Sequence, residues 1–79
     1  MKTDEELIKQ FQSGNDDSFN ELVKRHLPGT YGFFIKFTSD PIEAEDLAQD
    51  VFIKMYKALK KFRFQSKFKT YLYRANINM

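Results

Sequence analysis

Three carboxylates at helical spacing are the first side chains in this sequence that could do chemistry. Glu43, Asp46 and Asp50 are three and four residues apart, which places them on one face of a helix. This geometry would allow a magnesium site. However, acids near a helix N-terminus are also favoured by the helix dipole, and no second carboxylate cluster accompanies them. We therefore predict a solvated face or a binding patch, with a magnesium-dependent enzyme as the alternative.

Other groups with catalytic potential are scarce. His26 is the only histidine, and the sequence identifies no partner for it. The three glycines form neither a GxGxxG pattern nor a Walker loop, so no phosphate-cradling loop is predicted. The chain has no cysteine, which excludes a disulfide, a thiolate zinc site and a cysteine nucleophile within it. We predict a protein that is not an enzyme and needs no cofactor.

A basic and aromatic stretch over residues 54–74 is more informative. Its lysines and arginines alternate with Phe62, Phe64, Phe68, Tyr71 and Tyr73. Basic side chains neutralise phosphates, and aromatic faces stack on exposed bases with a gain of about 1–3 kcal/mol per base. This combination is typical of proteins that bind single-stranded nucleic acid. The alternative is that Phe62, Phe68 and Leu72 belong to the core and the lysines only solvate the surface.

The charge of the chain is divided by position. Residues 1–50 carry five basic and eleven acidic residues, whereas residues 51–79 carry eight basic residues and no acid. We expect the C-terminal segment to meet a polyanion and the acidic segment to meet a basic partner. No stretch approaches the roughly 18 apolar residues of a membrane span, and the acidic start is unlike a signal peptide. A cytoplasmic protein without a membrane partner is expected.

Helices must position these residues, because the apolar residues recur at helical spacing and no strand pattern is present. A first helix is expected after Thr3 and ends at residues 13–14. A second helix begins at Asn15 or Asp16 and meets Pro28, where we expect a kink or a break because proline removes a helical hydrogen bond. With 79 residues, the chain fits one small domain.

The third helix has the clearest start, with Asp40 as N-cap and a proline at the first helical position. It is predicted to span residues 41–60. Its expected apolar stripe consists of Ala44, Leu47, Ala48, Val51, Phe52, Met55 and Leu59. A basic, aromatic loop follows over residues 60–66, and a last helix opens at Ser66 or Lys67. The predicted fold class is all-α, a small bundle of three to four helices.

Three stretches of the chain together form a long, gapped motif: residues 40–52 (DPIEAEDLAQDVF), 61–63 (KFR) and 68–74 (FKTYLYR). They resemble region 2 of bacterial RNA polymerase sigma factors, most of all the extracytoplasmic-function (ECF) group. The family pattern runs roughly EAEDLxQDxFxxxWxxLxxF, then a short loop, then FxTWLYRIARN. Residues 19–23 also resemble the family's opening, so the resemblance covers nearly the whole chain. Tyr56 and Tyr71 stand where the family often has tryptophan.

The resemblance implies a role for each half of the charge division. In the family, the helix that matches residues 41–60 docks on the coiled coil of the polymerase β′ subunit. The positions that inherit this contact are Asp46, Gln49, Asp50 and Ile53. The loop and last helix of the family melt the promoter minus-ten element and capture a flipped base of the non-template strand. The positions that inherit this contact are Lys61, Phe62, Arg63, Phe64, Lys67, Lys69, Thr70, Tyr71 and Arg74.

The resemblance thus implies a sigma region 2 domain over residues 1–79 that directs transcription initiation. Its expected partners are the RNA polymerase core, promoter DNA and an anti-sigma factor. A complete ECF member also has a region 4 helix-turn-helix, so this chain alone is not expected to be a full sigma factor. It would be a domain of a longer protein or a naturally short region 2 protein. The alternative function is a protein-interaction domain that binds polymerase or an anti-sigma factor and has no DNA affinity of its own.

Overall fold

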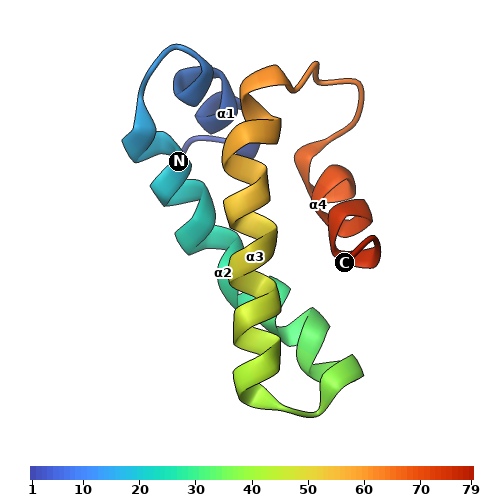
Figure 1. Cartoon of the computed structure of the whole chain (residues 1–79). Helices are drawn as coiled ribbons and strands as arrows, with labels where there is room; N and C mark the ends of the chain where they lie inside the picture. Colours follow the sequence, from blue (N-terminus) through green and yellow to red (C-terminus); the bar gives the residue numbers. More distant parts are fainter.

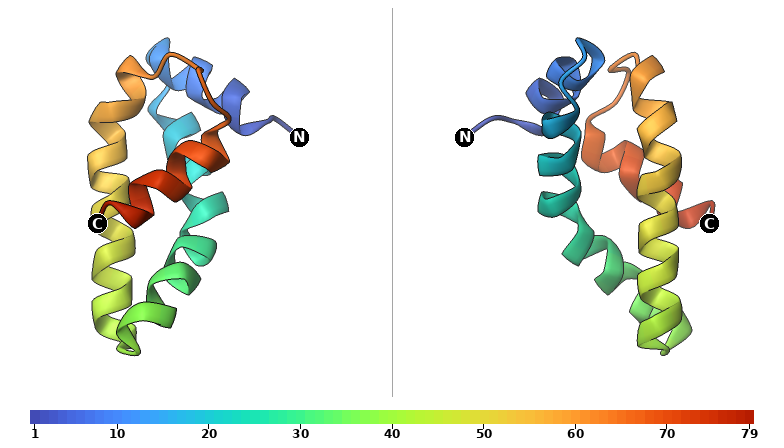
Figure 2. Two further views of the ribbon diagram at one scale, coloured as in Figure 1. Left: turned by 90° about the vertical axis from the view of Figure 1, so that its right-hand side faces the viewer. Right: turned by 60° about the vertical axis from the view of Figure 1, so that its left-hand side comes forward.

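The elements of this chain are four α-helices and one 3₁₀ turn, seen in a computed structural model that describes residues 1–79. They are α1 (Asp4–Gln12), α2 (Asp16–Thr38), α3 (Pro41–Ala58), η1 (Leu59–Lys61) and α4 (Phe68–Ile77). The predicted all-α class is confirmed. None of the helices combines the length and the apolar character needed to cross a membrane. Helices α2 and α3 form a long antiparallel pair, α1 lies at one end of it, and α4 lies across one side (Figures 1 and 2).

Local capping explains where the first three helices begin. At α1, the Thr3 hydroxyl accepts from the Glu6 backbone N–H at 3.1 Å, and the Glu6 carboxylate accepts from the Thr3 N–H at 3.0 Å. Helix α1 ends before Gly14, whose φ of +106° suits glycine. The Asn15 side chain caps α2, and the Asp40 side chain caps α3. The predicted caps of these helices are confirmed.

Pro28 does not break α2, which continues through it for 23 residues. Of the two predicted alternatives, a kink or a break, the break does not occur. The helix axis does change direction midway (Figure 2), as expected where proline removes a hydrogen bond. Leu22 and Phe34 are buried on either side of the proline. Their packing holds both halves of the helix in place, which explains why the chain remains helical.

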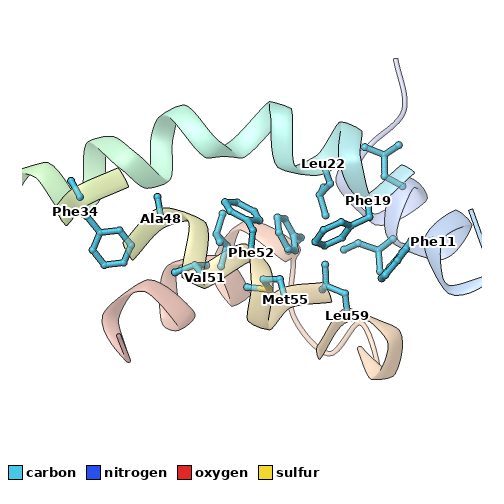
Figure 3. Close-up of a cluster of buried hydrophobic side chains, with 14 residues drawn as sticks. Phe11, Phe19, Leu22, Phe34, Ala48, Val51, Phe52, Met55 and Leu59 are labelled. Carbon is cyan, nitrogen blue, oxygen red and sulfur yellow. The ribbon is translucent and has the colours of Figure 1, made fainter. Parts of the chain in front are cut away.

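The core lies between α2 and α3 and is closed by α1 and α4. The buried apolar residues are Leu7, Ile8, Phe11, Phe19, Leu22, Phe34, Ala44, Ala48, Val51, Phe52, Met55, Leu59, Phe68 and Leu72. In Figure 3, the side chains of α2 and α3 point toward one another. Leu47, a member of the predicted apolar stripe of α3, is only half-buried and packs against the edge of the core. It lies in the first half of α3, away from the end that leads into η1.

Candidate nucleic-acid interface

The loop between η1 and α4 is held in place by a residue of α1. The Gln12 side-chain amide donates two hydrogen bonds, to the carbonyl oxygens of Leu59 and Phe62, each at 2.9 Å. The Leu59 carbonyl also accepts from the Phe62 N–H at 3.2 Å, so the Gln12 amide adds a second bond there and gives the Phe62 carbonyl a partner. Sequence reasoning missed Gln12, because nothing in its local pattern indicates a partner about 50 residues away.

Three aromatic residues of the predicted DNA-binding set form one cluster. The ring centroid of Phe62 lies 4.9 Å from that of Phe64 and 4.8 Å from that of Tyr71. All three side chains are half-buried. The Lys9 ammonium lies 5.5 Å from the Phe64 centroid, within cation–π range. The rings therefore form a partly exposed wall, and part of their surface is used in packing against one another.

A cleft of about 620 Å³, here called the basic cleft, opens beside this wall. Its lining residues are Ala58, Lys61, Phe62, Arg63, Gln65, Ser66, Tyr71 and Arg74. Five of the nine predicted DNA-binding residues meet here, and the lining has three cations and no acid. Gln65 and Ser66 were not in the predicted set, although they belong to the same polar loop. The cleft combines positive charge with aromatic surface, the two features that proteins use to bind single-stranded nucleic acid.

The other predicted DNA-binding residues lie elsewhere. Lys67 and Lys69 line a separate hollow of about 420 Å³ together with residues 1–5 and Arg25. Thr70 is exposed and lines neither hollow. Phe64 contacts the ring of Phe62 but does not line the basic cleft. The structure thus brings five of the nine residues together in the basic cleft and two in the second hollow, and it leaves Phe64 and Thr70 in neither.

Asp4 of α1 lines this second hollow and binds two basic residues of α2. Burial raises the pKa of Asp4, but hydrogen bonds from His26 at 2.8 Å and Arg25 at 3.0 Å outweigh that effect. The pKa of Asp4 therefore lies below its ordinary value. The sequence had identified no partner for His26. Its pairing with Asp4 links α1 to α2.

The four predicted polymerase-binding residues share one exposed face of α3. Asp46, Gln49, Asp50 and Ile53 follow the spacing of a helix face, and Ile53 is 69% exposed. Gln49 and Ile53 border a groove of about 820 Å³ between α2 and α3, here called the apolar groove. Its other lining residues are Phe19, Asn20, Val23, Leu27, Phe52, Lys54, Tyr56 and Lys57.

The three carboxylates of the predicted acidic row on α3 do not come together around a common point. Glu43, Asp46 and Asp50 are all exposed. No three histidine, cysteine, aspartate or glutamate side chains of the chain come together in an arrangement that could hold a metal ion. The row is thus an acidic face beside the apolar groove.

A comparison with known families decides where the chain belongs. The sequence pattern of sigma-70 region 2 matches residues 22–78, which include the loop, α3 and α4 with all thirteen predicted site residues. The chain belongs to the sigma-70 region 2 family. Helix α1 of this region 2 chain lies outside the matched range.

Relatives of this region 2 chain are named as sigma factors. It is 41% identical over 78 residues to RNA polymerase sigma-H factor of Pseudomonas aeruginosa. It is 36% identical over 76 residues to ECF RNA polymerase sigma-E factor of Escherichia coli, and 35% identical over 72 residues to ECF RNA polymerase sigma factor SigW of Bacillus subtilis. These matches cover 99%, 96% and 91% of the chain, respectively, but only 40%, 39% and 38% of the relatives. The predicted resemblance to ECF region 2 is confirmed, and the chain spans about two fifths of these relatives' length.

Proposed function

We propose that this chain is the part of a sigma factor that docks on the β′ coiled coil of RNA polymerase and recognises and melts the promoter minus-ten element. In this role it contributes to transcription initiation. The single observation that carries the proposal is the basic cleft, which Lys61, Arg63 and Arg74 line together with Tyr71 in a member of the region 2 family.

The DNA part of the proposal follows from the chemistry of the basic cleft. The three cations attract the phosphates of a single strand, because phosphate neutralisation releases counterions. Flipping a base from the non-template strand costs a few kcal/mol of unstacking, which stacking and hydrogen bonds in a shaped pocket recover. Tyr71 and Phe62 supply aromatic surface. The side-chain amide of Gln65 has an NH₂ group that can donate to a base edge and a carbonyl oxygen that can accept from it.

The polymerase part of the proposal rests on the α3 face. Asp46 and Asp50 present negative charge to a basic partner, and Ile53 and the apolar groove beside it supply an apolar centre. An apolar patch with a polar rim is the usual anatomy of a protein interface. The apolar groove and the basic cleft share no lining residue, so both partners can bind at once.

The test of the DNA part is fluorescence anisotropy with a minus-ten single strand and a scrambled strand at several salt concentrations. We expect selective binding by the unaltered chain. Tyr71→Ala should reduce discrimination, with Tyr71→Phe as the matched control that keeps the ring. Lys67→Ala or Lys69→Ala should weaken binding to both strands equally and lower the salt slope by roughly 0.7 for each phosphate that is no longer neutralised. Equal binding of the two strands by the unaltered chain would contradict minus-ten recognition.

A second candidate function is a protein-interaction domain without DNA affinity of its own. The observation that favours it is the mutual packing of Phe62, Phe64 and Tyr71, which uses ring surface that bases would need. This function predicts capture of the β′ coiled coil in a pull-down together with no anisotropy change for either strand.

A further inference from the structure

Helix α4 lacks a cap of its own. Its N-cap residue, Lys67, makes no side-chain hydrogen bond, and its first turn contains no acid. Lys67 and Lys69 instead place positive charge at the positive end of the helix dipole, which is the unfavourable end for cations. The local sequence therefore gives this ten-residue helix no stabilised starting point.

A carboxylate of α1 takes the place of the missing cap. The backbone N–H of Phe68, the first residue of α4, donates to Oε2 of Glu5 at 2.8 Å across 63 residues of sequence. The first N–H groups of a helix have no partner within the helix. A carboxylate that accepts from one of them makes a charge-assisted bond and also complements the helix dipole.

The side chain of Phe68 is fixed as well. Its ring is fully buried, and its centroid lies 5.1 Å from that of His26 in an edge-on arrangement. His26 is itself bonded to Asp4 at 2.8 Å. Two successive acids of α1 thus act on the first residue of α4, Glu5 directly on its backbone and Asp4 through His26 on its ring.

We propose that Glu5 is the N-cap of α4, supplied by another helix, and that it positions Tyr71 and Arg74 for DNA recognition. The two residues follow Phe68 by three and six positions, so a change in where α4 begins alters the placement of both in the basic cleft. Glu5 is a positioning residue and does not line the basic cleft. Its role in recognition rests on the function proposed above, whereas its capping role does not.

The test combines amide hydrogen exchange at Phe68 with the ratio of affinities for the minus-ten and scrambled strands. We expect Glu5→Ala to speed exchange of the Phe68 amide by about fivefold or more, the factor that corresponds to loss of a typical N-cap, and to lower the affinity ratio. Glu5→Gln keeps an acceptor but loses the charge, so its effect should be intermediate. The matched control is Glu6→Gln, which removes the same charge one residue away but faces Thr3. It should leave the Phe68 amide unchanged.

A rescue variant separates capping from a general loss of structure. Adding Lys67→Ser to Glu5→Ala places a hydroxyl at the N-cap position of α4, where it can accept from the N–H of Lys69 or Thr70. It should slow exchange of those two amides and restore the affinity ratio. If Glu5→Ala does not fold, Glu5→Gln against Glu6→Gln provides the same comparison.

The outcomes distinguish this inference from the proposed function. Unchanged exchange at Phe68 in Glu5→Ala overturns the capping role. Faster exchange with an unchanged affinity ratio overturns the positioning role. If the unaltered chain does not discriminate between the strands, the proposed DNA function fails together with the positioning role, and the exchange data still decide whether Glu5 caps α4.

Discussion

Helices α3 and α4 carry the two proposed binding surfaces, and they are held in place in different ways. Helix α3 has 18 residues and its own N-cap, Asp40. Helix α4 has ten residues and depends on Glu5, while the loop before it depends on Gln12. The surface proposed to face protein thus stands on a helix that the local sequence specifies. The surface proposed to face DNA stands on a segment that distant residues hold in place.

The two helices also differ in how completely their polar groups are hydrogen-bonded. The Asp40 carboxylate satisfies the first N–H groups of α3. By contrast, α4 buries the Oδ1 atom of Asn76 without a hydrogen-bond partner. A helix that is short, has no local cap and depends on a few long-range bonds opens more easily than one that is stabilised from within. The comparison therefore predicts different responses of α3 and α4 to substitution.

The largest expected effect is that of removing the ring which anchors α4. Phe68→Ala should lower the free energy of unfolding by about 3–5 kcal/mol, because a fully buried ring is removed and a cavity remains. Urea denaturation measures this change. The control is Leu47→Ala on α3, which should cost less because Leu47 is only half-buried. An equal loss of unfolding free energy in both variants would contradict the view that α4 depends on this one buried ring.

The two N-cap positions provide a sharper test of the comparison. Asp40→Ala should cost about 1 kcal/mol, because the Asp40 carboxylate accepts from the Ile42 N–H at 3.0 Å. Lys67→Ala, at the corresponding position of α4, should cost nothing measurable because Lys67 makes no capping bond. Thermal or urea unfolding of both variants checks this. A clear loss for Lys67→Ala would mean that α4 does have a local cap.

Acid should weaken the α1 contacts that support α4. The pKa of Asp4 lies below its ordinary value of 3.8, so its stabilising bonds are fully present above that pH and disappear as the pH falls through the lower, folded-state pKa. Asp4→Asn should therefore be less stable than the unaltered chain near neutral pH, and the difference should shrink below about pH 4. Urea unfolding across this range measures it. A difference that does not vary with pH would exclude an ionic role for Asp4.

The smallest effect on stability is expected on the acidic face of α3. Asp50→Lys should change the free energy of unfolding by no more than about 0.5 kcal/mol, because Asp50 is exposed and makes no tertiary bond. The same change should weaken capture of the β′ coiled coil in a pull-down, because it reverses one charge of the proposed contact. Glu21→Lys on α2 serves as a control for net charge. Unchanged capture by Asp50→Lys would remove this face from the polymerase contact.

Much of the fold, and the exposed face of α3 within the candidate site, could be predicted from the sequence. The caps Thr3, Asn15 and Asp40 act on residues three or fewer positions away, so their effect is visible in a short window. The exposed face with Asp46 and Asp50 follows from the helical period alone. The family motifs of α3 and α4 are likewise local, and the resemblance that they carry was confirmed.

The sequence by itself thus determined the helices, the charge division and the family. Only the tertiary structure decided that α2 continues through Pro28, that Lys67 and Lys69 lie apart from the basic cleft, and that Glu5 caps α4. The physical reason is the range of the interactions. Caps and helical faces depend on neighbours within one turn, whereas these three features depend on packing between helices that are far apart in the chain, for which a single sequence contains no local signal.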